Sequence, residues 1–291
     1  MSHAGLRPAG ALDALFSRTV DPLDRPAVER LAAVLGDPAV LARRLAPGLA
    51  RVAADPVAQP GLDGIEHEAM RGVVLYRDAR LTAMLAVAHI EAIDHRGPAV
   101  LNFGAGHMLT VFHARAPVTI ELYRSLAGCA GRHRFSAARA PACRAAGRRE
   151  MRAGDWVMSA RESETMRIVG ARAPVPLVRV YWRGASPLPA RRYRWPGGKY
   201  LGLTMAREED ARAQLMISAL RAMECGDAAE ALAGVVESDV FTLRWHAMRA
   251  WLAIDVANAL PALARMARYD RHPEIRRAAT AAQRMVDALA A

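Results

Sequence analysis

The stretch REMRAGDWVMSARESETMRIVGA, residues 149–171, indicates most clearly how the middle of this chain folds. Short apolar runs alternate here with turn residues, of which Gly154 and Asp155 are the clearest. Runs of this length, bounded by Gly, Asp and Ser, are typical of β-strands joined by tight turns. The stretch therefore predicts consecutive antiparallel strands.

Runs of the same kind continue on both sides of this stretch. They are GVVLYRDARLTAMLAVAHIEA (72–92), PAVLNFGAGHMLTVFHA (98–114), VTIELYRS (118–125) and PLVRVYW (176–182). Strands at this density, with no helix-length periodic segment between most of them, indicate an antiparallel sandwich or barrel. We expect this domain to cover residues 61–204, including a trailing hairpin that turns at 196–198.

The two ends of the chain show helical periodicity instead. Residues 1–60 form a predicted N-terminal helical segment, in which Asp24 and Asp37 stand at N-cap positions and Pro47 is expected to break the second helix. Apolar residues return to helical spacing from about residue 205 and keep it to residue 291. The sequence thus predicts an α+β chain with three segments, 1–60, 61–204 and 205–291.

Two stretches carry a resemblance to a known set of proteins. The first is the Gly154–Asp155 turn between strands, and the second is RWHAMRAWLAIDVANALPALARMARYDRHPEIRRAA, residues 244–279. Together they resemble uncharacterised bacterial proteins that combine a cupin-like domain with C-terminal HEAT-like helices. The resemblance implies a cupin-like antiparallel β-barrel, or jelly roll, followed by a HEAT-like helical bundle. It also implies pairing of two copies into a homodimer.

The positive charge is concentrated in one part of the chain. The formal net charge is +11, and residues 115–194 alone contain 17 Arg and five acidic residues. An anionic ligand, an acidic partner or a nucleic acid would each be attracted to such a region. Arg-for-Lys codon bias is an alternative explanation, because Lys199 is the only lysine, but this bias does not account for the shortage of acids.

Several of these arginines flank FSAARAPACRAAG, residues 135–147, which has little strand or helix signal. We expect a flexible loop at the barrel mouth, where arginines hold a carboxylate or phosphate by bidentate hydrogen bonds. The predicted ligand-binding residues are Arg132, Arg134, Arg148 and Arg149. Aromatic residues for base stacking are scarce here, which weighs against nucleic acid as the partner.

Two histidines raise the question of a metal site. His107 and His113 are six residues apart in a predicted strand, so both side chains point to the same face. Metal-binding cupins carry two histidines one residue apart, and this chain lacks that pair. A rebuilt site would take His107, His113, Glu121 and His133 as ligands, for Fe(II) or another divalent metal. Alternatively, the two histidines are hydrogen-bonded residues of the barrel core.

These observations favour a binding module that needs no cofactor and takes a small anionic ligand or an acidic protein partner. A metal-dependent cupin oxygenase is the first alternative, and a nucleic-acid-binding protein is the second. Three cysteines without CxxC spacing fit a reducing compartment. No secretory signal or membrane-spanning apolar run stands in the sequence, so we expect a cytoplasmic protein with no membrane contact.

Overall fold

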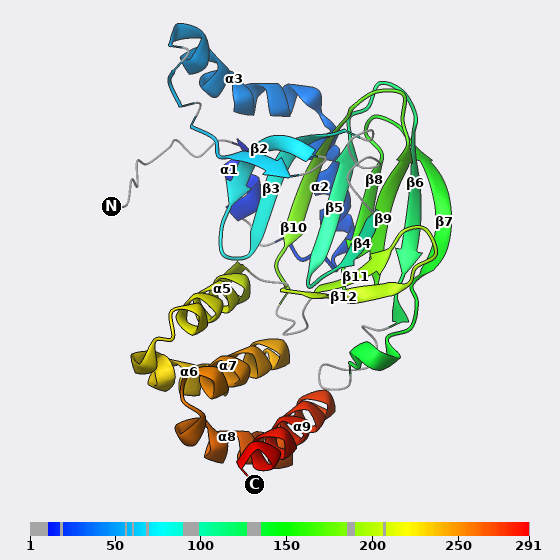
Figure 1. Ribbon diagram of the computed structural model, residues 1–291. Helices are drawn as coiled ribbons and strands as arrows, with labels where there is room; N and C mark the ends of the chain where they lie inside the picture. The colour runs from blue at the N-terminus through cyan, green and yellow to red at the C-terminus, as the bar shows by residue number, and fades with distance from the viewer. Residues whose placement is uncertain are drawn as a thin grey trace.

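The computed structural model describes residues 11–17, 20–55, 57–59, 61–67, 70–89, 99–126, 135–184, 190–205 and 208–290. Three helices come first in the chain, a β-domain follows, and helices end the chain (Figure 1). The predicted α+β class is confirmed. The β-domain has the two-layered antiparallel arrangement of a jelly roll, and its sheets do not close into a continuous barrel.

The first layer of the β-domain is a six-stranded sheet with the order β1-β2-β3-β10-β5-β8. Neighbouring strands in it are antiparallel. The bounds are β1 Gly64–His67, β2 Met70–Arg77, β3 Leu81–Ala88, β5 His107–Phe112, β8 Trp156–Ala160 and β10 Val175–Trp182.

The second layer consists of two three-stranded sheets, β12-β11-β4 and β7-β6-β9, which adjoin where β4 contacts β9. The bounds are β4 Val100–Phe103, β6 Val118–Arg124, β7 Arg144–Met151, β9 Glu164–Gly170, β11 Ala190–Arg194 and β12 Tyr200–Thr204. The expected hairpin is therefore present as β11 and β12, and β11 also pairs with β4.

Residues 144–147 were expected to be loop, and they form the beginning of β7 instead. The reason is tertiary, because these residues take their hydrogen bonds from β6.

The core between the layers follows from strand alternation. Phe112 and Leu177 stand opposite each other on β5 and β10 and pack against Ile120 and Ile168 of the second layer. The residues between them in sequence, such as Val111 and Val178, point away from the sandwich interior and belong to a different apolar cluster. Both faces of β5 and β10 are therefore covered, one by the second layer and one by helices.

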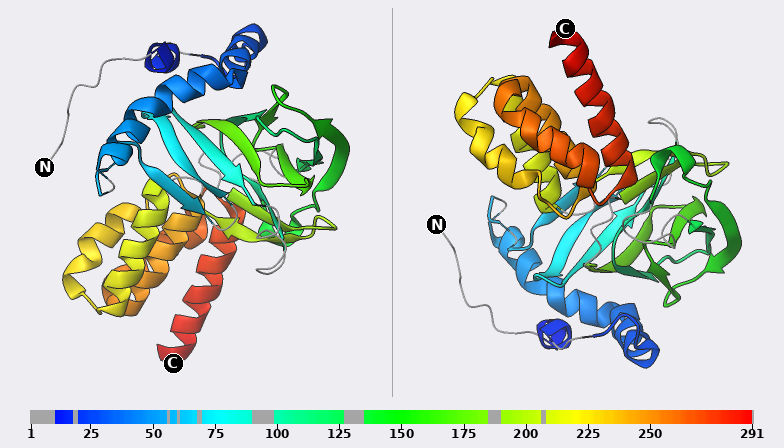
Figure 2. Two further views of the ribbon diagram at one scale, coloured as in Figure 1. Left: turned by 90° about the horizontal axis from the view of Figure 1, so that it is seen from above. Right: turned by 90° about the horizontal axis from the view of Figure 1, so that it is seen from below.

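The N-terminal helices cover the outer face of the first layer (Figure 2). They are α1 Ala11–Ser17, α2 Arg25–Gly36 and α3 Pro38–Ala54. The side chains of Asp24 and Asp37 accept backbone hydrogen bonds at the starts of α2 and α3, as predicted. The expected break at Pro47 is wrong, since α3 continues through it. Pro47 is exposed, and its missing N–H removes one hydrogen bond without exposing any core.

The C-terminal helices form a bundle with an apolar core of their own. They are α5 Glu208–Ala222, α6 Ala229–Val235, α7 Phe241–Ile254, α8 Val256–Tyr269 and α9 Pro273–Ala290. A segment of the β-domain enters this core, where Phe135 is buried and the hydroxyl of Ser136 donates to Glu274 at 2.5 Å. Figure 2 shows the bundle and the N-terminal helices against different sides of the β-domain. None of the described helices combines the length and the apolar character that crossing a bilayer requires.

Candidate functional site: cationic groups of the jelly roll

The two histidines of the candidate metal site lie on the outer face of the first layer. They alternate with Thr110 and Phe112 along β5, so they share the face of Leu109 and Val111, which packs under the N-terminal helices. His113 Nε2 lies 2.9 Å from the carbonyl oxygen of Leu35 in the last turn of α2. Alternation placed the two imidazoles on one face, and this face is not the interior of the jelly roll.

Glu121 lies on the outer face of the other layer. Its carboxylate accepts hydrogen bonds from the Tyr123 hydroxyl at 2.6 Å, Arg148 Nη2 at 2.5 Å and Trp195 Nε1 at 3.2 Å. The hydrogen bond from Tyr123, followed by that from Arg148, holds the pKa of Glu121 below its ordinary value. Burial and the neighbouring Glu121 raise the pKa of Tyr123 to about 12. Glu121 is thus a carboxylate that protein donors already satisfy.

These positions do not fit one metal ion. His107 and His113 face away from the sandwich on one side and Glu121 on the other, while His133 lies outside the described residues. Within the part of the chain that the structure describes, no three His, Cys, Asp or Glu side chains form a group that could hold a metal. We therefore assign no chemistry to iron at these residues.

Of the four arginines expected at the barrel mouth, Arg132 and Arg134 lie outside the described residues. Arg148 and Arg149 are consecutive on β7, where neighbouring side chains point to opposite faces. Arg148 pairs with Glu121 on the outside, whereas Arg149 lines a hollow of about 570 Å³ between the layers. The structure therefore separates these two side chains instead of combining them in one site.

A second cationic site lies inside the jelly roll, and the prediction from sequence missed it. Arg179 stands on β10 opposite Thr110 of β5 and Met84 of β3, two residues beyond the buried Leu177. Its side chain therefore points into the sandwich. Nη1 lies 3.3 Å from the sulfur of Met70, and the buried Nε has no hydrogen-bond partner. Burial, and after it the charge of Arg161, lower the pKa of Arg179 to about 10, so this guanidinium remains a cation at neutral pH.

Arg161 supplies the second charge, from the turn between β8 and β9. Its guanidinium carbon lies 4.8 Å from the centre of the Tyr181 ring, a cation–π contact. On the other side it lies against Gly104, where an added Cβ would approach the guanidinium to 3.2 Å. The Tyr181 hydroxyl donates to the carbonyl of Ala105 at 3.2 Å and so fixes the ring. Arg161 thus contacts a ring and the backbone, and no described carboxylate forms an ion pair with it.

The surroundings of Arg161 and Arg179 contain a further hydrogen-bond donor without a partner. Thr110 is 1% exposed, and its hydroxyl has no partner. None of the ion pairs of the described residues involves Arg161 or Arg179. Met84, Met108, Arg179 and Tyr181 are only half-buried, although they point at the second layer, whereas Phe112 and Leu177 are completely buried. These four side chains are therefore less completely covered than Phe112 and Leu177 in the same sheet.

One signal in the sequence points to this site. In VPLVRVYW, residues 175–182, Arg179 is the only charged residue. The other residues are Pro176 and apolar or aromatic residues. A strand with apolar residues on both faces is covered on both sides. An arginine in such a strand has to lie in a covered layer, and charged residues are seldom buried there without a partner.

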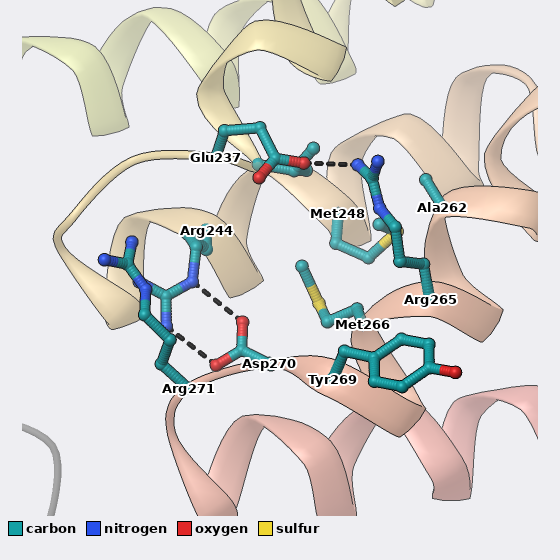
Figure 3. Close-up of a pocket in the computed structure, with 10 residues that line it drawn as sticks. Glu237, Arg244, Met248, Ala262, Arg265, Met266, Tyr269, Asp270 and Arg271 are labelled. Carbon is teal, nitrogen blue, oxygen red and sulfur yellow. Dashed lines mark hydrogen bonds and ion pairs between the residues drawn. The ribbon is translucent and has the colours of Figure 1, made fainter.

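The helical bundle has a hollow of its own, of about 270 Å³, which Figure 3 shows. At its edge Arg244 and Asp270 form a bidentate ion pair, with nitrogen–oxygen distances of 2.8 and 2.7 Å. Their side chains are only 4% and 5% exposed. Burial alone would raise the pKa of Asp270, but Arg244 and the backbone N–H of His272 outweigh it and lower this pKa. The charges of Arg244 and Asp270 neutralise each other. The described arginines at this hollow are in ion pairs, unlike Arg161 and Arg179 in the jelly roll.

Comparison with known proteins gave similarities at the level of solved structures. No family model matches the chain, and no curated protein matches it. The hydroxypropylphosphonic acid epoxidase of S. wedmorenis aligns at 7% identity and a TM-score of 0.27, over 42% of this chain and 55% of the enzyme. The chain thus spans about half the length of that protein.

Two further solved structures show similarity to this chain. Streptomyces albus HEPD, with 2-hydroxyethylphosphonate and Fe(II) bound, aligns at 15% identity and a TM-score of 0.30, over 59% of this chain and 44% of that one. The cupin domain of Schizosaccharomyces pombe Cnp3 aligns at 10% identity and a TM-score of 0.25, over 44% and 74% respectively. The ligands of those proteins are not assigned to this chain, whose chemistry we derive from its own residues.

Proposed function

We propose that this protein is a cupin-like binding module whose jelly-roll interior takes a small anion, a carboxylate or a phosphate, between Arg161 and Arg179. The observation that carries the proposal is the pair of interior guanidinium groups without a carboxylate among the described residues. Burying a charge without a counter-charge costs several kcal/mol, and a bound anion would remove most of that cost.

The donor set fits an oxyanion. Guanidinium groups present fixed, planar donors that match carboxylate and phosphate oxygens, and the hydroxyl of Thr110 can donate one more hydrogen bond. Arg161 is already oriented by Tyr181 and Gly104, so little side-chain entropy is lost when an anion binds. The half-buried side chains around Arg179 provide the access.

Titration with four defined anions tests the proposal: phosphate, sulfate, oxalate and succinate. Melting temperature and calorimetric binding are measured for the wild type, Arg161→Gln and Arg179→Gln, in a chloride buffer. Arg284→Gln is the matched control, because it removes one positive charge from an exposed position on α9. Circular dichroism establishes that each variant folds.

At least one anion should stabilise the wild type and the control. A charge-assisted hydrogen bond contributes about 1.5–3 kcal/mol, so each interior variant should bind that anion roughly 10- to 100-fold more weakly. Equal stabilisation of all four proteins would mean diffuse binding to surface arginines and would overturn the proposal. Absence of stabilisation by all four anions would overturn it as well.

A further inference from the structure

The two layers of the β-domain each end in a strand with a free edge on the same side of the sandwich. Among the strands that the structure describes, β8 ends the first layer and pairs only with β5, and β7 ends the second and pairs only with β6. The turn at residues 152–155 joins β7 to β8, so both free edges diverge from a common point. Figure 1 shows β7 as the outermost strand of the domain. Free edges present unpaired backbone N–H and C=O groups that another strand can use.

The hollow of about 570 Å³ lies between these two edges. Residues of both edge strands line it, together with the ends of β6 and β9 and the entry to α2. They are Pro22, Leu23, Arg25, Val28, Leu122, Tyr123, Arg124, Ala146, Arg149, Trp156, Val157, Met158, Ser159, Glu164 and Thr165. Its wall is apolar on the side of Leu23, which is 75% exposed, and of Trp156, which is half-buried. The hollow can therefore receive side chains of an added strand.

The charge around the free edges is positive. β7 is exposed at every residue except Met151, and Arg144, Arg148 and Arg149 lie on it. In the hollow, Arg124 is paired with Glu164 and Arg25 with Glu29, whereas no ion pair of the described residues includes Arg144 or Arg149. Like charges on an edge repel a second copy of the same strand, which is one way in which proteins prevent edge-to-edge aggregation. The same charges attract a strand that carries carboxylates.

We infer that the seam between β7 and β8 binds an extended acidic peptide segment of a protein partner. The peptide adds a strand to a free edge through backbone hydrogen bonds, the mode known as β-augmentation. Its carboxylates meet Arg144 and Arg149, and an apolar side chain between them enters the hollow against Leu23 and Trp156. Backbone pairing favours a peptide over a nucleic acid, because a nucleic acid has no peptide backbone that could form a β-strand. Nucleic-acid binding also relies on aromatic side chains that stack on bases, and Trp156 is the single tryptophan in the hollow. Peptide binding here relies on Arg144, Arg149 and the edges of β7 and β8, and it does not require an anion between Arg161 and Arg179.

The probe is a fluorescein-labelled peptide of four Glu-Val repeats, followed by fluorescence anisotropy with the full chain. Two matched peptides separate the contributions. In the first, alternate backbone nitrogens are methylated, which removes N–H donors and keeps the charge. In the second, Lys replaces Glu. The protein variants are Arg149→Gln and Arg149→Glu, and Arg284→Glu is the control for a reversed surface charge on α9.

The Glu-Val peptide should bind the wild type and Arg284→Glu with equal affinity. Binding should weaken at least 10-fold with the methylated peptide, with the Lys peptide and with Arg149→Glu, and by a smaller factor with Arg149→Gln. Equal binding of the methylated and unmethylated peptides would overturn β-augmentation. Tighter binding of a single-stranded oligonucleotide than of the Glu-Val peptide, at the same salt concentration, would overturn the choice of partner, as would the absence of peptide binding.

Discussion

Arg148 and Arg149 are neighbours on β7, yet their side chains lie on opposite faces of this strand. Arg148 Nη2 lies 2.5 Å from Glu121 on the outer face, and Arg149 lines the hollow between the layers. A strand sends consecutive side chains to opposite faces, so two adjacent arginines cannot serve one site without a bulge. One arginine is structural here, and the other is available to a ligand.

This difference predicts unequal effects on stability. Arg148→Gln should lower the free energy of unfolding by about 0.5–1 kcal/mol, because it removes a charged donor from a mostly buried carboxylate while Arg148 itself is largely exposed. Arg149→Gln should change it by less than about 0.5 kcal/mol. Urea unfolding of both variants measures the effects. A larger loss in Arg149→Gln than in Arg148→Gln would contradict the assignment of faces.

The interior arginine should destabilise the protein in the absence of ligand. Arg179→Met keeps the length of the side chain and removes a charge for which the described residues supply no counter-charge, so we expect the free energy of unfolding to rise by about 1–2 kcal/mol. Arg284→Gln, with the same loss of charge at the surface, should stay within about 0.5 kcal/mol of the wild type. Thermal and urea unfolding in chloride buffer provide the measurement. A clear loss of stability in Arg179→Met would show that Arg179 has favourable partners in the folded state.

His113 should contribute to attaching α2 to the sheet. His113→Ala removes the hydrogen bond to the carbonyl of Leu35 and should cost about 1–2 kcal/mol, part of it from the acceptor left without its donor. His107→Ala is the matched control, because the His107 side chain is half-buried on the same face and makes no described hydrogen bond. Urea unfolding compares the two variants. Stoichiometric iron in the wild type that is lost in His113→Ala would contradict the structural role and support the metal-dependent alternative.

The ion pair in the helical bundle should make stability depend on pH. Asp270→Asn leaves the Arg244 guanidinium buried without its counter-charge and should cost about 3–5 kcal/mol. The pKa of Asp270 is lower in the folded protein than its ordinary value of 3.8, so its contribution is complete at neutral pH. That contribution is lost as the pH falls below about 4 and through the folded pKa.

Urea unfolding at a series of pH values tests this, with Glu237→Gln as the control. Glu237 pairs with Arg265 at the surface, where both side chains are more than 60% exposed, and its loss should cost less than about 1 kcal/mol. Figure 3 shows both ion pairs at the same hollow. The Asn variant should show a flatter acid limb than the wild type. An equally steep limb in both would mean that other carboxylates control the acid stability.

Much of the fold was predictable from local sequence. Alternating runs with turn residues identified the strands, and Asp24 and Asp37 marked the starts of α2 and α3, because side-chain capping is a contact between near neighbours in the chain. The loop expected over residues 135–147 was wrong in its last four residues, 144–147. The first residues of β7 have little strand propensity and are strands only because β6 lies beside them.

The candidate site was less predictable. Alternation along β5 determined that His107 and His113 share a face, but a period of two contains no information on which face is covered by helices and which by a second sheet. That choice was decided by α2, which packs on the face of both histidines. In the same way Arg161 and Arg179, from a turn and a strand 18 positions apart, influence each other electrostatically because β8 and β10 both pair with β5. The segments, their periods and the concentration of arginine could be read from the amino-acid sequence, since these properties depend on residues that are near neighbours in the chain. Which arginines are paired, which are exposed and which have no described counter-charge follows from the packing of the whole chain, because it depends on groups that are distant in the sequence.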